Sequence, residues 1–196
     1  DSSSRGMSSD VSITAADVPN EPDKSTITAA ISSSPSNDIS NIIGANFPLV
    51  DVVTENSNTA EIYATTQFSI TELADVLTAT ITPEEESEVI DNQQIFIYPN
   101  EFVTIKKSEA DGQVILIEVA TESFVKENYS PSFLQTYFTI RLLDSLFGNN
   151  WSTQRSLACK TGDCYGGYSG KNATDYGTTT RRGSSTYRGG GPSFGK

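Results

Sequence analysis

The chain alternates short apolar segments with polar connections, a pattern typical of a small mixed domain. Within residues 71–81, four apolar side chains recur at helical spacing. Ser69 and Glu72 stand just before them in the arrangement of a capping box, in which each side chain satisfies a backbone N–H of the first turn. This combination predicts an amphipathic helix over 71–81.

Five segments show the alternation, or the continuous apolar character, of β-strands. They are 47–53, 61–68, 94–98, 102–107 and 113–120. Asp111 and Gly112 form a hairpin-turn signal between the last two. Segment 113–120 is almost continuously apolar, which predicts a central strand covered on both faces. The sequence therefore predicts an α+β fold, with an antiparallel sheet of four to five strands packed by two main helices, and low-complexity tails at both ends.

The second main helix is predicted over 132–147, where apolar residues spread around most of the helical wheel. Such a helix must be covered on most of its faces. One interpretation is a core helix that packs on the sheet. The alternative is a helix that docks a partner, and the candidate docking residues are then Phe133, Tyr137, Phe138, Leu142 and Phe147.

Shorter helical segments are also predicted. Asp38 caps a short helix that ends at Gly44. Pro83, followed by acidic residues, marks the start of another helix that runs to about Ile90. Residues 122–129 form one or two further helical turns.

Composition divides the chain into three parts. Residues 1–37 are rich in Ser and read as a flexible arm or tether, because they bury little apolar surface. In an alternative interpretation, 11–13 or 27–31 pairs as a strand. Residues 38–150 form the acidic α+β domain. Residues 151–196 form a Gly-, Ser- and Tyr-rich basic tail.

The net charge of −12 is divided unevenly between these parts. Residues 1–150 carry 23 acidic and 6 basic side chains, whereas residues 151–196 carry 2 and 7. An acidic domain repels phosphates, so we expect no nucleic-acid partner. The basic tail, with Arg181, Arg182 and Arg188 as the candidate contacts, suits an anionic polymer or the acidic face of its own domain.

The two cysteines, Cys159 and Cys164, lie close together in the sequence. Gly162 between them allows a turn that brings the two within disulfide reach, and we predict one disulfide that pins the start of the tail. A disulfide favours an oxidising, extracytoplasmic location. A reduced, inert pair and a redox-active pair are the alternatives, although the spacing is not that of a CxxC motif.

No catalytic residue is predicted. The chain has no His, which excludes Ser-His-Asp and Cys-His catalysis and histidine metal sites. Two cysteines make a poor zinc site, and the acids of 84–91 lack the spacing of a calcium loop. We therefore expect neither a metal nor a cofactor. Lys106 and Lys107 leave their strand on opposite faces, so one of them approaches the core unless it extends to solvent.

The C-terminal third resembles a family of small exported bacterial proteins, commonly lipoproteins, of no assigned activity. The resemblance rests on the cysteine pair, on Tyr165-Gly-Gly-Tyr168, and on the terminal segment from Arg188-Gly-Gly-Gly to Lys196. It implies export and attachment to the cell envelope, and it supplies no catalytic residue. The lipid-attachment cysteine of such proteins would lie upstream of Asp1.

These observations favour a non-enzymatic, extracytoplasmic interaction module of the cell envelope, tethered or secreted. Its partner would be a protein or an anionic envelope polymer. The alternative is a structural subunit of a filament or surface layer. In that case the N-terminal arm or the C-terminal tail would add as a strand to a second copy, giving a homo-oligomer.

Overall fold

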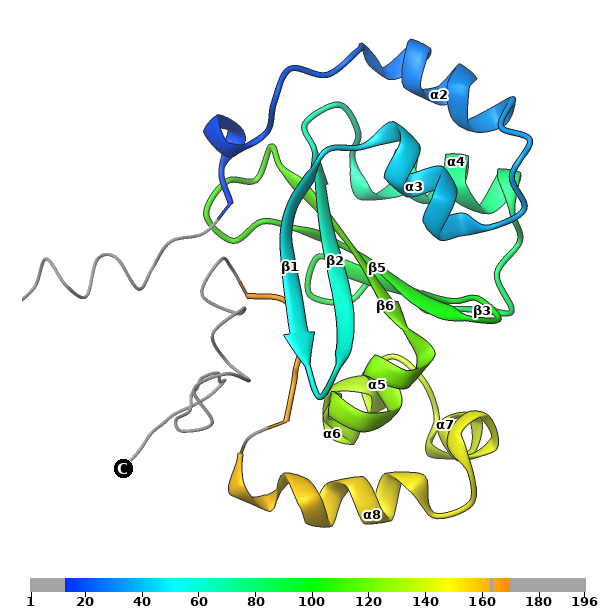
Figure 1. The fold of residues 1–196 in the computed structure, drawn as a ribbon, viewed down its shortest axis with the longest axis vertical. Helices are drawn as coiled ribbons and strands as arrows, with labels where there is room; N and C mark the ends of the chain where they lie inside the picture. The colour runs from blue at the N-terminus through cyan, green and yellow to red at the C-terminus, as the bar shows by residue number, and fades with distance from the viewer. Residues whose placement is uncertain (1–12, 163, 170–196) are drawn as a thin grey trace, which may run out of the picture.

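The computed structural model describes residues 13–162 and 164–169. Six antiparallel strands form one sheet in the order β1-β2-β6-β5-β4-β3, with helices on both faces (Figure 1). The strands are β1 Leu49–Glu55, β2 Asn58–Thr65, β3 Glu85–Glu86, β4 Gln93–Ile97, β5 Glu101–Lys107 and β6 Ile115–Thr121. The helices are α2 Lys24–Ser32, α3 Ile39–Asn46, α4 Ile70–Thr80, α5 Glu122–Asn128, α6 Pro131–Gln135, α7 Ile140–Phe147 and α8 Trp151–Ala158, with 3-10 turns η1 Ala15–Asp17 and η2 Cys159–Thr161. This α+β architecture confirms the predicted fold class, with one strand more than expected.

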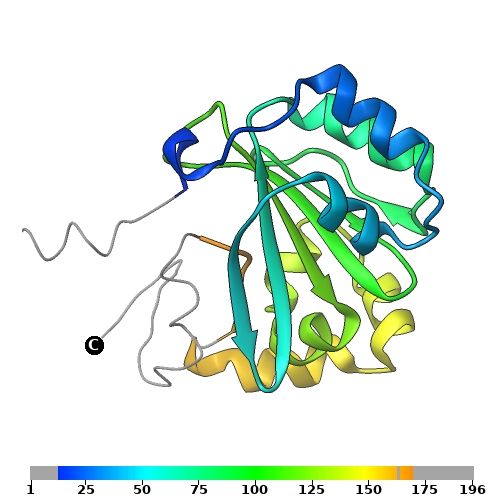
Figure 2. The ribbon, with the colours of Figure 1, turned by 45° about the horizontal axis from the view of Figure 1, so that its top comes forward.

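Each face of the sheet has its own hydrophobic core. Helices α2, α3 and α4 cover one face, and α2 lies alongside α4 (Figure 2). We call the face that α2, α3 and α4 cover the N-terminal face. Helices α5 to α8 cover the opposite one, the C-terminal face. Alternate residues of β6 enter the two cores, as Ile117 and Leu116 illustrate, so the strand is buried on both faces as its sequence predicted.

The strongest local signal of the sequence is confirmed in α4. The Ser69 hydroxyl accepts a hydrogen bond from the Glu72 backbone N–H, and the Glu72 carboxylate accepts one from Ser69 N–H. Asp38 likewise caps α3, which runs to Asn46, two residues beyond the expected end at Gly44. Both helices begin where a side chain supplies the acceptor that the first turn lacks.

Residues 24–32 form helix α2, where the sequence predicted part of a flexible arm. Asp23 caps this helix, and Ile27 and Ile31, one helical turn apart, are buried on the N-terminal face. Lys24 also forms an ion pair with Glu72 of α4, 2.8 Å between Nζ and Oε2. These two isoleucines bury apolar surface, which the average composition of residues 1–37 does not reveal. The alternative strand over 27–31 is wrong, and residues 11 and 12 lie outside the described residues.

The helix predicted over 132–147 is two helices. Thr139 caps α7 by accepting a hydrogen bond from the Leu142 N–H, whereas α6 ends near Gln135. Two short helices at an angle present more apolar faces to one core than a straight helix does, which explains the apolar character around the whole wheel.

The helix predicted after Pro83 is also wrong, because this segment runs along the sheet edge as β3. Glu84 N–H donates to the Ile97 carbonyl, and Ser87 N–H donates to the Ile95 carbonyl. The Ser87 hydroxyl in turn accepts from Ile95 N–H. Pairing with β4 satisfies the backbone groups that a helix would have satisfied internally.

Helix α8 extends the core beyond residue 150, the predicted domain end. Trp151 is buried on the C-terminal face, and its indole N–H donates to the Lys126 carbonyl at 2.9 Å. None of the helices in 13–162 and 164–169 has the length and apolar character of a membrane span.

Candidate functional site

A carboxylic acid lies in the middle of the sheet. Glu118 of β6 is 2 % exposed and stands on the C-terminal face, between Ile62 of β2 and Thr104 of β5. Such a group is costly to bury unless a hydrogen bond compensates its lost hydration. The segment that covers Glu118 must therefore supply a hydrogen bond to its carboxyl group.

The cover comes from residues 164–169, which we call the latch segment. Tyr165 pairs with the chain between α5 and α6 as a parallel bridge: its N–H donates to the Asn128 carbonyl, and its carbonyl accepts from Ser130 N–H, both at 2.8 Å. Its phenol reaches inward and donates to Glu118 Oε2 at 2.7 Å. The Tyr165 ring packs against Phe124, 5.2 Å between ring centroids.

The far end of the latch segment is held by two further charged side chains. The Tyr168 hydroxyl donates to Asp51 Oδ2 of β1 at 2.6 Å, and the Tyr168 carbonyl accepts from Lys106 Nζ of β5 at 2.8 Å. Between the tyrosines, Gly167 has φ = +100°, and a Cβ there would lie 3.3 Å from the Phe133 ring. The positive φ therefore favours glycine, and an added Cβ would also require the Phe133 ring to shift by a few tenths of an ångström.

Burial shifts the ionisation of this cluster. It raises the pKa of Glu118 above its ordinary value, an effect that the hydrogen bond from Tyr165 opposes. It lowers the pKa of Lys106 and raises that of Tyr165 well above its usual range. Burial also raises the pKa of Tyr129 well above its usual range, and the nearby Glu118 carboxyl adds to this effect. Acid and lysine are both pushed toward their neutral forms, as expected for ionisable groups in a low-dielectric interior.

Two buried oxygens in the cluster are not satisfied. Neither Glu118 Oε1 nor the Tyr129 hydroxyl makes a hydrogen bond of good geometry among residues 13–162 and 164–169, although the two groups lie close enough for Glu118 to raise the pKa of Tyr129. A small pocket opens nearby, lined by Lys106, Leu116 and Tyr168 among others. Unsatisfied polar atoms of this kind are uncommon in folded proteins.

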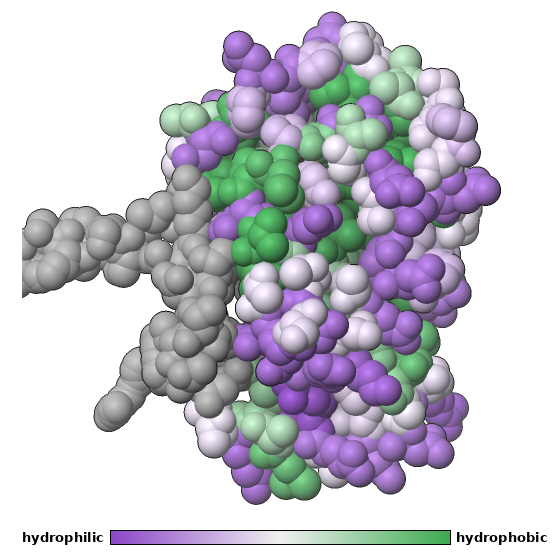
Figure 3. All heavy atoms as spheres, viewed as in Figure 1, coloured by the Kyte–Doolittle hydropathy of each residue, from purple (hydrophilic) through white to green (hydrophobic). Residues whose placement is uncertain are grey.

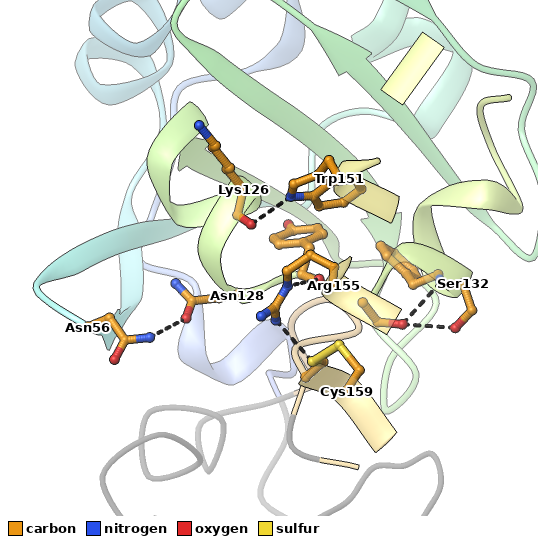
Figure 4. Close-up of a disulfide and its surroundings, with 11 residues drawn as sticks. Asn56, Lys126, Asn128, Ser132, Trp151, Arg155 and Cys159 are labelled. Atoms are coloured by element: carbon orange, nitrogen blue, oxygen red, sulfur yellow. Dashed lines mark hydrogen bonds between the residues drawn. A yellow bond between two sulfur atoms is a disulfide. The ribbon is translucent and has the colours of Figure 1, made fainter. Parts of the chain in front are cut away.

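The predicted disulfide joins Cys159 and Cys164, with 5.4 Å between their Cα atoms, and it closes a short loop just before Tyr165 pairs with the chain between α5 and α6. Arg155 of α8 reaches back to this bond (Figure 4). Its Nη2 lies 2.9 Å from Cys164 Sγ, and its Nε donates to the Tyr129 carbonyl at 3.2 Å. One guanidinium thus contacts both the disulfide and the chain beside the covered acid.

The five candidate docking residues all belong to the C-terminal core or pack against it. Phe138 and Phe147 are buried, and the other three are partly buried. Their packing accounts for their apolar character without a partner, and docking through them remains a prediction. They are Phe133, Tyr137, Phe138, Leu142 and Phe147.

The remaining predicted contacts of the tail, Arg181, Arg182 and Arg188, lie outside the described residues. Of the two lysines on β5, Lys106 turns inward, whereas Lys107 is exposed. Glu118 was not among the site residues that the sequence predicted. Its signal was present, because it is the single charged residue in the apolar run 113–120.

The outer surface offers one apolar feature beside this site. Apolar side chains gather over β1, the edge strand of the sheet (Figure 3). Leu49 is 50 % exposed and Val52 is 37 % exposed. Within the described residues no strand pairs with the outer side of β1. An edge of this kind can accept another strand.

No curated protein and no solved structure matches the chain. A family model with the description "Domain of unknown function (DUF4247)" matches residues 26–194, which include most of α2, the sheet, the disulfide and most of the basic tail. The expected membership of a family without an assigned activity is confirmed. The chain belongs to the DUF4247 family.

Proposed function

We propose that this protein is a non-enzymatic interaction module of the cell envelope, located outside the cytoplasm, that holds an anionic polymer through its basic tail. The disulfide between Cys159 and Cys164 is the observation that carries the proposal. Such bonds persist in oxidising compartments and are rare in the cytosol. The resemblance to exported, commonly lipid-anchored proteins points to the same location.

The distribution of charge supports a polymer partner. The disulfide lies where the acidic domain passes into a tail that carries Arg181, Arg182 and Arg188. The latch segment roots this tail on the C-terminal face through Tyr165 and Tyr168. Phosphate-bearing polymers bind arginine through charge-assisted, often bidentate hydrogen bonds. The interaction then depends on the tail, because the predicted docking residues of 133–147 contribute to the core.

Binding to inorganic polyphosphate tests this function. We expect the full chain to bind the polymer at about 50 mM salt and to release it as salt rises, because displaced counterions drive such binding. The variant with Arg181, Arg182 and Arg188 changed to Ala should bind at least about tenfold more weakly, a loss of about 1.4 kcal/mol.

The matched control removes three exposed positive charges from the domain instead, through Lys107→Ala, Lys126→Ala and Arg141→Ala. This variant has the same net charge as the tail variant, so it should retain most of the binding if the tail is the binding site. Equal loss in both variants, or no binding by the unmodified chain, would contradict the proposal. Trapping the thiols of Cys159 and Cys164 in intact cells tests the location: a pair that is reduced in all of the protein would argue against export.

A second candidate function is self-assembly through the edge of the sheet. The exposed apolar side chains of Leu49 and Val52 on β1 favour it, since an open edge with apolar neighbours can accept a strand from another copy. Light scattering at high concentration should then give a mass above the 21.1 kDa of one chain. Val52→Lys should restore the monomer. A monomeric mass throughout would remove this candidate.

A further inference from the structure

We propose that the bond between Cys159 and Cys164 is a thiol–disulfide exchange site, in which Cys164 leaves as the thiolate and reduction releases the latch segment from Glu118 and Lys106. This inference goes beyond the polymer-binding function and does not depend on it. It combines three features: a cation beside one sulfur, exposed chain around the other, and, directly downstream, the segment that covers a buried acid.

The two sulfurs lie in different surroundings. The Arg155 guanidinium is 2.9 Å from Cys164 Sγ, and the Tyr129 carbonyl accepts from the same side chain. A neighbouring cation stabilises a thiolate and lowers the pKa of the thiol. In exchange reactions the sulfur that makes the more stable thiolate is the faster leaving group. The attacking thiolate should therefore bond to Cys159 and expel Cys164.

The chain on both sides of Cys159 is exposed. Both cysteines are half-buried, and the chain around the first one, residues 156–158 and 160–162, is exposed. Leu157, two residues before Cys159, is 58 % exposed and offers an apolar contact to an approaching protein. Access of this kind is a condition for exchange with an external thiol.

The reductant we infer is a dithiol, either small or carried by a protein. Its first thiolate attacks Cys159 Sγ, so a mixed disulfide forms as the protein's own S–S bond breaks. The electron pair of that bond leaves with Cys164 Sγ. The second thiol of the reductant, as a thiolate, then displaces Cys159, and the Cys159 and Cys164 thiolates each take up one of the two protons that the dithiol releases. The dithiol ends as a disulfide, and the protein has gained two electrons and two protons.

Reduction removes the closure that precedes the latch segment. The remaining attachments are the bridge of Tyr165 to 128–130, its bond to Glu118, and the contacts of Tyr168 with Asp51 and Lys106. A disulfide that closes so short a loop stabilises the folded chain only modestly through loop entropy. We expect its loss to allow local opening, which places the buried carboxyl and ammonium groups in contact with solvent.

The site of attack can be read directly. Brief treatment of the full chain with glutathione, followed by alkylation and peptide mass spectrometry, should place glutathione on Cys159 and the alkyl group on Cys164. Arg155→Met should reduce this preference and slow reduction by dithiothreitol about tenfold, whereas Arg141→Met, a matched exposed arginine, should leave both unchanged. Glutathione mainly on Cys164, or equal rates in all three proteins, would overturn the proposed chemistry.

Because Arg155→Met also removes the bond to the Tyr129 carbonyl, a second measurement isolates the thiol itself. In the Cys159→Ser variant, the pKa of the Cys164 thiol should lie below its ordinary value of about 8.5, and it should rise when Arg155 is also replaced. An unshifted pKa in Cys159→Ser would overturn the assignment of the leaving group.

Hydrogen exchange tests the release of the latch segment. The Tyr165 amide donates to the Asn128 carbonyl. On reduction, the protection factor of this amide should fall at least tenfold. The fluorescence of Trp151, the single tryptophan, should stay that of a buried indole, because α8 remains on the core. Unchanged protection of the Tyr165 amide would overturn the proposed release of the latch segment. Loss of the buried Trp151 fluorescence at the rate at which Tyr165 loses protection would also overturn it, because it would show global unfolding rather than local release.

Discussion

Tyr165 and Glu118 are 47 residues apart in the sequence, and the phenol of one donates to the buried carboxyl of the other at 2.7 Å. Glu118 lies at the centre of the sheet, and Tyr165 is the first residue after the disulfide. This bond joins the start of the basic tail to the interior of the acidic domain.

The Tyr165–Glu118 bond should contribute measurably to stability. Tyr165→Phe removes the donor to Glu118 Oε2, while Oε1 already makes no hydrogen bond of good geometry among the described residues. We expect the free energy of unfolding in urea to fall by about 1–3 kcal/mol, the cost of a buried polar group left unpaired.

A double-mutant cycle with Glu118→Leu separates this bond from general packing. If the bond carries the effect, Tyr165→Phe should cost much less in the Glu118→Leu background than in the unmodified chain. An equal cost in both backgrounds would mean that the hydroxyl stabilises the protein through some other contact.

Glu101, at the start of β5, should make stability depend on pH. Partial burial, reinforced by the neighbouring Asp38 carboxylate, raises the pKa of Glu101 from its ordinary value of 4.5 to about 7. The folded state therefore binds the proton more tightly than the unfolded state. Its contribution to stability is present below pH 4.5 and is lost as pH rises through about 7.

Glu101→Gln removes this penalty because its amide stays neutral. We expect the variant to melt a few degrees higher than the unmodified chain at pH 8 and to show little difference near pH 4. The increase is modest because solvent screens a half-exposed group. Glu88→Gln, at an exposed carboxylate, is the control, and its melting temperature should not rise above that of the unmodified chain at pH 8. Parallel melting curves of Glu101→Gln and the unmodified chain across this range would refute the prediction.

Gly167 should be the least replaceable residue of the latch segment. Its φ is +100°, and an added Cβ would lie 3.3 Å from Phe133. Gly167→Ala should therefore cost more than about 1 kcal/mol, and it should increase exchange of the Tyr165 amide. Gly166→Ala is the matched control, since nothing lies within 4 Å of its added Cβ. Similar effects of the two substitutions would count against the described path of the chain.

Helix α2 should contribute to the stability of the protein, although the composition of its region is polar. Ile31 is fully buried on the N-terminal face, so Ile31→Ala should destabilise the protein by about 2–5 kcal/mol. Ala29→Ser, at an exposed position of the same helix, should change stability by less than about 0.5 kcal/mol. A flexible arm would tolerate both substitutions equally, and thermal melting distinguishes the two outcomes.

The sequence by itself determined those elements whose signals are local. The capping box of Ser69 and Glu72 and the Asp38 cap use side chains within three residues of the backbone groups they satisfy. The apolar run of 113–120 marked the central strand, because only a strand covered on both faces can bury it. The cysteine spacing likewise predicted the disulfide, since Gly162 between the two allows a turn.

The tertiary structure alone decided the elements whose partners are distant in the chain. Helix α2 is held by burial of Ile27 and Ile31 on the N-terminal face, and β3 exists because β4 pairs with it. The same holds for Glu118, whose partner Tyr165 comes from the far side of the disulfide. Composition and periodicity report local preference. Burial and pairing depend on which distant segments meet, and these contacts override that preference.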